Sequence, residues 1–311
     1  MQIAKERQAE SIEARRVAAE LEQLFLNYAE RTGFRKVIPK GTQFYPEEEK
    51  MPLYRYLRNY PLRYPDNSVM KYIDTPIDVQ KAMLPQQWKE LFRPFGYDDC
   101  EIGYCVFPDG SGYVASYSVR PVGISSSMEQ WYRHWSNQYS HSVVSEHGNL
   151  RYKIANPADH FDNHYVNYVD GRLGISFQES MDLGGKDRYR EVIRHPFSLM
   201  DYGMTEENVL QLRRAGIDFD GKGYYETYDE PGSSFCVSME RQCPFGGTEI
   251  RSRKWIGWRP VNGVLVRDPS TKCTEESLKQ MLTHMIVERE HLYSFLPELY
   301  EEYHDLPEDA D

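Results

Sequence analysis

The sequence contains no long hydrophobic run. No stretch of the 311-residue chain approaches the ~20 consecutive apolar residues that a membrane-spanning helix needs. Met1 is followed by charged and polar residues rather than by the apolar segment of a secretory signal. We therefore expect no membrane association and a cytoplasmic location.

Cysteine is scarce. The chain has five, at positions 100, 105, 236, 243 and 273, and none stands in a Cys-x-x-Cys pair. This spacing argues against a structural zinc ribbon. The odd number of cysteines also fits a reducing compartment, where thiols stay unpaired.

Positive charge is in deficit. The chain has 37 Lys and Arg against 48 Asp and Glu, which gives a formal net charge of −11. Because nucleic-acid phosphates would be repelled by such a surface, the composition argues against a nucleic-acid partner. The sequence also lacks internal repeats and low-complexity segments.

Tyrosine, in contrast, is abundant, with 24 residues in a chain of otherwise ordinary composition for a soluble globular protein. A tyrosine side chain offers an apolar ring and a hydroxyl group together. Many tyrosines therefore suit a pocket for a phenolic or other aromatic ligand. They equally suit packing and subunit interfaces, and both interpretations stay open at this point.

One long helix is predicted near the C-terminus. Thr274 can cap its first turn, where Glu275 and Glu276 favour the positive end of the helix dipole. Apolar residues then recur at three- and four-residue steps and form one stripe. The stripe consists of Leu278, Met281, Leu282, Met285, Leu292, Phe295 and Leu296.

His284 and Glu288 accompany this stripe, four residues apart and therefore on the same side of the helix. A carboxylate that enters an apolar face needs a partner, because removing it from water costs several kcal/mol. A divalent metal ion is one such partner. An arginine is the other, and Arg251 and Arg253 of a predicted strand are available for that pairing.

The region before this helix is dominated by predicted strands. They cover residues 101–107, 113–120, 150–154, 165–169, 174–179, 235–241, 248–257 and 263–267, with short helices at 76–92, 126–135 and 205–214. A charged helix over 2–32 and a Pro- and Tyr-rich loop over 41–66 precede them. This order predicts an α+β fold, in which the long helix lies on the concave face of a curved antiparallel sheet and the cavity between them binds the ligand.

Two further residues are candidates for the same cavity. Glu179 shares one face of its predicted strand with Ile175 and Phe177, so it becomes a second buried carboxylate if that face is in the core. His147 directly precedes the predicted strand at 150–154. Two acids and two histidines would then converge, in the N/O ligand set that zinc accepts.

Other histidines remain as alternatives. His134 and His141 belong to the same cluster along the chain as His147. His160 and His164 have the spacing of helical ligands, but Pro157 and Asn163 make their segment look like a loop.

Several segments, taken in order, resemble the 2,4-diacetylphloroglucinol hydrolase and phloretin hydrolase family. They are residues 107–115 (FPDGSGYVA), 128–132 (MEQWY), 150–154 (LRYKI), 156–160 (NPADH), 249–257 (EIRSRKWIG) and 284–288 (HMIVE). Each segment alone is weakly specific, whereas the ordered set is fairly specific.

This resemblance implies a Bet v 1-like helix-grip domain over residues 93–311, preceded by a smaller, mainly helical region over 1–92 that helps to form a homodimer. It also implies zinc-dependent (Zn2+) hydrolysis of the carbon–carbon bond between an acyl group and a phenolic ring. The family's metal is held by two histidines and two glutamates. We assign these positions to His147, Glu179, His284 and Glu288.

The chain also departs from the family pattern. Ser136 follows Trp135 where the family has its first histidine, and residues 137–146 look like an insertion. There is no histidine between 195 and 284, where the family has one facing the substrate, and Lys254 stands at a position that is usually aromatic. These changes leave the substrate open.

The implied reaction needs water to attack the acyl carbon while the ring leaves and is protonated at carbon. Zinc can polarise the carbonyl group or acidify its bound water. Tyr152 and Asn149, close to His147, are the predicted substrate contacts. Two alternatives remain: a metal enzyme of the same fold acting on a different aromatic ketone, acid or ester, and a non-catalytic binder of an aromatic ligand.

Overall fold

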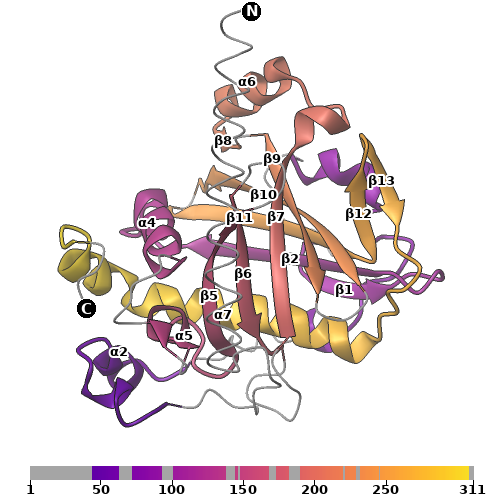
Figure 1. Ribbon diagram of the computed structural model, residues 1–311. Helices are drawn as coiled ribbons and strands as arrows, with labels where there is room; N and C mark the ends of the chain where they lie inside the picture. Colours follow the sequence, from indigo (N-terminus) through magenta and orange to yellow (C-terminus); the bar gives the residue numbers. More distant parts are fainter. Residues whose placement is uncertain are drawn as a thin grey trace, which may run out of the picture.

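The computed structural model describes residues 44–62, 72–92, 101–137, 144–145, 148–167, 173–181, 190–219, 221–228, 232–244 and 246–307 (Figure 1). The helix predicted over 2–32 lies outside this part of the chain. The boundary at residue 92 stays a prediction. Among the described residues, no helix combines the length and the hydrophobicity needed to cross a membrane.

A nine-stranded sheet forms the centre of the molecule, with strand order β1-β2-β11-β10-β9-β7-β6-β5 and with β8 paired to β10 outside this path. Each pairing of neighbouring strands is antiparallel. The strands are β1 (Gly103–Val106), β2 (Gly112–Arg120), β5 (His160–Asn167), β6 (Leu173–Glu179), β7 (Arg190–Ser198), β8 (Ile217–Asp218), β9 (Lys222–Tyr228), β10 (Ser233–Gln242) and β11 (Thr248–Ile256).

Smaller elements surround this sheet. Two short two-stranded sheets pair β3 (Val144–Ser145) with β4 (Gly148–Asn149) and β12 (Trp258–Val261) with β13 (Val264–Arg267). Among the described residues, the helices before the last one are η1 (Glu48–Lys50), α2 (Tyr54–Asn59), η2 (Pro85–Phe92), α4 (Ser126–Asn137), α5 (Leu150–Lys153), η3 (Leu199–Tyr202) and α6 (Glu206–Arg214).

The predicted C-terminal helix is confirmed as α7 (Glu275–Tyr303). A capping box holds its first turn: Thr274 Oγ1 accepts from the Ser277 backbone N–H, and Ser277 Oγ accepts from that of Thr274, both at 3.1 Å. Figure 1 shows α7 running across the strands of the sheet. The α+β prediction is thereby confirmed, with an antiparallel sheet and a long final helix.

The apolar stripe of α7 packs in two places. Its first half, including Leu278 and Leu282, joins a buried cluster with Tyr104 of β1 and Val114 of β2. Its second half packs against α2, α4 and α5 through a further set of buried side chains. That set includes Tyr56, Tyr132, Trp135, Leu150, Leu292, Phe295, Leu296 and Leu299.

Arg251 and Arg253 lie on the face of β11 that points away from α7, since neighbouring side chains of a strand alternate between faces. Arg253 Nη2 donates to Glu101 Oε2 at 2.7 Å, and Arg251 Nε lies 3.5 Å from the same oxygen. Trp255, on this face too, donates to the Met83 carbonyl at 2.6 Å. The two arginines therefore neutralise Glu101 and do not reach the acid of the long helix.

Several local predictions were wrong, among them the helix over 76–92, of which only the η2 part (Pro85–Phe92) is helical. Residues 150–153 form a helical turn (α5) rather than a strand, because Asn149 caps it by accepting the Arg151 backbone N–H at 3.0 Å. The segment predicted as loop over 41–66 contains η1 and α2, which begins directly after Pro52 and Leu53.

Glu129 ties α4 to α7 and to the sheet. Its carboxylate accepts from Tyr293 of α7 at 3.1 Å and from Arg133 at 2.5 Å, and it lies 3.6 Å from Arg120 of β2. Burial alone would raise the pKa of Glu129, but Arg133, Arg289 and Arg120 outweigh it and lower this pKa to about 2. The ion cluster therefore stabilises the folded chain only while Glu129 is ionised.

We predict an acid-dependent loss of stability through Glu129. Its folded pKa lies below the value near 4.5 of an unperturbed glutamate, so its contribution is complete above about pH 4.5 and declines as the pH falls toward 2. The contribution reaches up to about 3 kcal/mol, at 1.36 kcal/mol per pKa unit.

Urea unfolding of wild type and Glu129→Gln at pH 7 and pH 3 measures the contribution of Glu129 to the free energy of unfolding. We expect the stability difference between them to shrink at pH 3, whereas Glu301→Gln, an exposed control on α7, should show no such change. A difference that is equal at both pH values would contradict the assignment.

Candidate metal centre

Four side chains from three elements converge beside α7. His284 and Glu288 lie one turn apart on the helix, Glu179 ends β6, and His160 begins β5. The Nε2 atoms of His160 and His284 lie 3.8 and 3.7 Å from Glu179 Oε2. The same two atoms lie 3.9 and 3.8 Å from the carboxylate oxygens of Glu288.

The strand register explains this convergence. His160 lies directly opposite Glu179 in the antiparallel pair of β5 and β6. Since side chains of paired residues extend to the same face, both point toward the helix that crosses the sheet. His160, Glu179 and His284 are buried. Among the described residues, they form a group whose potential ligand atoms lie within 4.8 Å of one another, close enough to hold one metal ion.

Hydrogen bonds fix the orientation of both imidazoles. His284 Nδ1 lies 2.8 Å from Asp159 Oδ2, and Asp159 itself accepts from Ser180 Oγ at 2.7 Å. His160 Nδ1 donates to the Tyr152 carbonyl at 3.0 Å. With both Nδ1 atoms engaged in this way, each ring presents Nε2 to the centre, as in metal-ligating histidines supported by an outer carboxylate or carbonyl.

Tyr152 supports two of the four groups. Its ring stacks on His160 with centroids 3.8 Å apart and planes 6° from parallel. Its hydroxyl donates to Glu179 Oε2 at 2.6 Å. Burial, reinforced by the Glu179 and Glu288 carboxylates, raises the pKa of Tyr152 well above its ordinary value, so the hydroxyl keeps its proton.

Burial and mutual charge perturb every group of this cluster. Burial raises the pKa of Glu179 to about 7 and lowers that of His160 to about 4. Burial opposes protonation of His284, but Glu179 and Asp159 outweigh it and raise its pKa to about 9. Burial likewise opposes ionisation of Glu288, whose pKa His160 and His284 nevertheless lower. Such coupled shifts in a cavity wall mark a candidate functional site.

The donor set fits a divalent ion. Two imidazole nitrogens and two carboxylate oxygens are ligands that zinc accepts, and tetrahedral coordination separates such atoms by ~3.4 Å. The observed separations of 3.7–3.9 Å are close to that value. Among the described residues, no Lys or Arg lies within 4.0 Å of either carboxylate. A cation at the centre would therefore offset charge that no Lys or Arg of the described chain pairs with directly.

Three of the four predicted ligands, Glu179, His284 and Glu288, lie together here, and the second imidazole comes from His160. His147, the predicted fourth ligand, lies outside the described residues, as does His141. His134 is exposed on α4 and pairs with the Tyr165 hydroxyl at 3.1 Å.

His160 was named only as an alternative, and its neighbour Asp159 was missed as a site residue. Pro157 made their segment look like a loop, although it only separates the α5 turn from β5. The Asp-His pair at the end of the quoted segment 156–160 was the signal available in the sequence.

Asn149, predicted to contact the substrate, is fully buried as the cap of α5. Its Nδ2 donates to the Ser136 carbonyl at 2.7 Å and to Asn163 Oδ1 at 2.8 Å. Asn163 in turn donates to Asn137 Oδ1 at 3.0 Å, and Asn137 and Asn163 both line the cavity. Asn149 therefore reaches the cavity only through this amide chain.

A cavity of about 610 Å³ adjoins the metal-binding group. Tyr152, Glu179, His284 and Glu288 form part of its wall. Its lining elsewhere is largely aromatic, apolar or charged, from the strands, α4 and α7. That lining includes Tyr132, Tyr165, Phe177, Phe219, Tyr224, Met281, Met285, Arg133, Arg194, Lys254 and Arg289.

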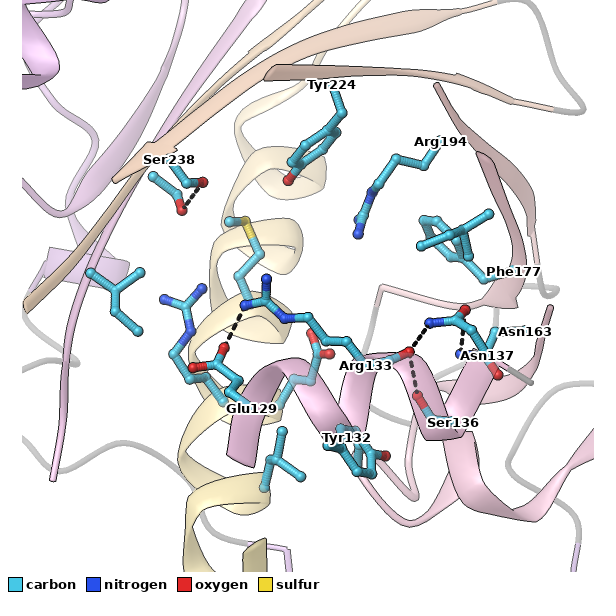
Figure 2. Close-up of a pocket in the computed structure, with 18 of the residues that line it drawn as sticks. Glu129, Tyr132, Arg133, Ser136, Asn137, Asn163, Phe177, Arg194, Tyr224 and Ser238 are labelled. Carbon is cyan, nitrogen blue, oxygen red and sulfur yellow. Dashed lines mark hydrogen bonds and ion pairs between the residues drawn. The ribbon is translucent and has the colours of Figure 1, made fainter. Parts of the chain in front are cut away.

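Charged groups occupy two sides of the cavity. Figure 2 shows Arg194 and Tyr224 pointing from the sheet into the cavity, and Glu129 and Arg133 paired on α4 opposite them. Arg194 donates to Glu226, which also pairs with Lys254 of β11. One end of the cavity is therefore lined by the imidazole and carboxylates of the candidate metal centre, and the wall around Arg194 and Lys254 is positively charged.

Comparison with known proteins identifies relatives of this chain. A 2,4-diacetylphloroglucinol hydrolase of Pseudomonas sp is 25% identical over 277 residues, covering 81% of this chain and 88% of the relative. A second protein of the same name, from Pseudomonas protegens, is 25% identical over 277 residues, covering 81% of this chain and 84% of the relative. The family described as DAPG hydrolase PhiG domain matches residues 84–185 and 201–301. Because that match spans both strands and the helix of the metal-binding group, the chain belongs to the DAPG hydrolase family.

Proposed function

We propose that this protein is a zinc-dependent hydrolase that cleaves the carbon–carbon bond between an acyl group and a phenolic ring of the phloroglucinol type. The observation that carries the proposal is the buried group of His160, Glu179 and His284, joined by the partly exposed Glu288, at one end of an aromatic-lined cavity. The named activity of the two relatives supports the same chemistry. The curved sheet with a helix across it fits the helix-grip (Bet v 1-like) arrangement.

His160, Glu179, His284 and Glu288 would hold the ion. When bound, zinc supplies a Lewis acid for the acyl carbonyl and a more acidic water. The four ligands come from one helix and two paired strands, so their positions are fixed by the fold rather than by loops. Such placement keeps the acyl carbon and the attacking water in one geometry.

Tyr152 acts on the same site as a positioning residue. Its hydroxyl donates a hydrogen bond to Glu179 Oε2, and its ring stacks on the imidazole of His160. Asn149 acts further out, by orienting Asn163 and, through it, Asn137 at the cavity wall. The tyrosine and methionine side chains around the cavity exclude water from the phenolic ring.

The reaction is tested by incubating zinc-loaded protein with 2,4-diacetylphloroglucinol and following both products by chromatography. We expect one acetate and one monoacetylphloroglucinol per substrate consumed. Phenyl acetate, an oxygen ester, serves as the comparison substrate. Turnover of the ester without turnover of the ketone would contradict C–C hydrolysis and favour the alternative of a different acyl substrate.

We predict that Glu288→Ala loses metal and activity together. A preformed site retains its ion through gentle purification, so the wild type should hold about one zinc per chain and the variant less than about half of that. Elemental analysis measures the metal. Glu301→Ala changes an exposed glutamate of the same helix and should match wild type in both measurements. A Glu288→Ala protein that stays active and metal-replete would refute the ligand assignment.

We also predict a role for Asp159, which touches His284 but not the metal position. Asp159→Asn should weaken zinc affinity roughly 10–100-fold, the usual cost of losing such an outer carboxylate. Competition with a chelator measures the affinity, and exposed Asp201→Asn is the control. An unchanged zinc affinity in Asp159→Asn, with the fold intact by circular dichroism, would show that Asp159 does not support the site.

A further inference from the structure

Arg194 of β7 is held firmly, yet it reaches the cavity. Its Nε and Nη2 both donate to Glu226 Oε1, at 3.0 and 2.8 Å. Its guanidinium lies 4.9 Å from the ring centroid of Phe177 and 4.4 Å from that of Tyr224. Its side chain remains 36% accessible, whereas Glu226 is 1% accessible. The guanidinium is therefore preorganised at the cavity wall by two rings and one carboxylate.

One edge of this guanidinium remains for a ligand. Nε and Nη2 face Glu226, and among the described residues Nη1 has no hydrogen-bond partner. An arginine fork presents its donors in fixed directions, so Nη1 is aimed away from Glu226. Figure 2 shows the guanidinium of Arg194 directed into the cavity, beside the Tyr224 ring.

Around Glu226, positive charge exceeds negative charge among the described residues. Glu226 pairs with Lys254 as well as with Arg194, so two cations share one carboxylate. Burial opposes ionisation of Glu226, but Lys254 and Arg194 outweigh it and lower its pKa to about 2, so it is fully ionised near neutral pH. One positive charge is left over at the wall. An anionic oxygen of a ligand would complete the group.

The other cavity charges do not supply that anion. Glu129 on the opposite side is engaged by Arg133, and it lies near Arg120 and Arg289. At the metal end, Glu179 and Glu288 would neutralise a divalent ion. On the sheet side, Arg194 thus keeps a donor and positive charge for a ligand, whereas Arg133 and Arg289 line the opposite side beside Glu129.

The spacing along the sheet matches a substrate that spans both ends. Arg194 pairs with Ile175 of β6, and Glu179 lies four residues further along that strand. This offset separates the two backbone positions by about 13 Å, at ~3.3 Å per residue. Phe177 lies between them on the same face and lines the cavity. An aromatic ring beside Phe177 can therefore place its acyl group at the metal end and an opposite substituent at Arg194.

We propose that Arg194 determines specificity by binding a negatively charged oxygen on the substrate ring, either an ionised phenol or a ring carboxylate. The preferred substrates are then anionic aryl ketones, oriented with the anion at Arg194 and the acyl group at the metal. This inference rests on the proposed function for the acyl end of the site. The anion-binding part can be measured without turnover.

Calorimetry with two ring probes on the zinc-loaded protein tests this binding. We expect wild type to bind 2,4,6-trihydroxybenzoate, an anion, more tightly than neutral phloroglucinol. Arg194→Met should weaken the trihydroxybenzoate about tenfold or more, the loss of one charge-assisted contact, and leave phloroglucinol nearly unchanged. Equal losses for both probes, or no loss for the anion, would overturn the proposal.

Two further variants keep this test decisive. Arg241→Met removes another arginine that pairs with a buried glutamate, Glu249, but does not line the cavity, and it should not change the preference. Arg194→Lys retains the charge while losing the fork. It should restore part of the anion preference even if Arg194→Met folds poorly. An Arg194→Lys protein that is folded and prefers the neutral probe would overturn the proposal.

The pH dependence of turnover distinguishes the two anions. For 2,4-diacetylphloroglucinol, the ratio of wild-type to Arg194→Lys kcat/KM should rise as the substrate phenol ionises if that phenol is the recognised group. A flat ratio, with the trihydroxybenzoate preference intact, assigns a ring carboxylate. If no aryl ketone turns over but the probe preference is lost in Arg194→Met, the proposed reaction fails and the anion site stands.

Discussion

The organisation of this protein depends on two carboxylates and two imidazoles that are brought together at the wall of the cavity, three of them buried and Glu288 partly exposed. Each acid would be costly there by itself, because a desolvated charge needs a compensating partner. The sheet register places His160 beside Glu179, and the long helix adds His284 and Glu288 one turn apart. The arrangement is consistent with a bound divalent cation as the missing partner.

The rest of the sheet separates charges between its two faces. On the face away from α7, Arg251 and Arg253 pair with Glu101 under the segment that carries η2. On the cavity face, Lys254 of the same strand pairs with Glu226. The alternation of one strand thus supplies a structural ion network behind the sheet and a functional wall in front of it. Among the described residues, no arginine lies within 4.0 Å of Glu179 or Glu288 at the candidate metal centre.

The sequence was a good guide to the parts with regular periodicity. The spacing of apolar residues after Thr274 predicted α7 and its capped start, and the period-two pattern around Glu179 predicted its inward direction. His160 was kept only as an alternative to His147, because the choice depended on where a short turn ends and β5 begins. The start of β5 is set by the pairing of His160 with Glu179 of β6, a residue distant in the chain, which no local pattern encodes.

The positive wall was missed for a related reason. β7 contains Arg190, Glu191, Arg194, His195 and Pro196, and this mixture lacks the alternation that marks a half-buried strand. Pro196 is tolerated because it lies beyond the stretch that pairs with β6, opposite Tyr224 of β9. Lys254 was noticed as a departure from the family pattern, but its buried partner Glu226 became visible only through the pairing of β10 with both β9 and β11.

The central claim is that one ion lies between His160, Glu179, His284 and Glu288. An anomalous difference map from crystals of the purified protein, collected on either side of the zinc absorption edge, tests it most directly. The account predicts one strong peak at ~2.0–2.2 Å from an atom of each of these side chains. A well-ordered map with no peak there, or with a peak whose ligands are other residues, would contradict it.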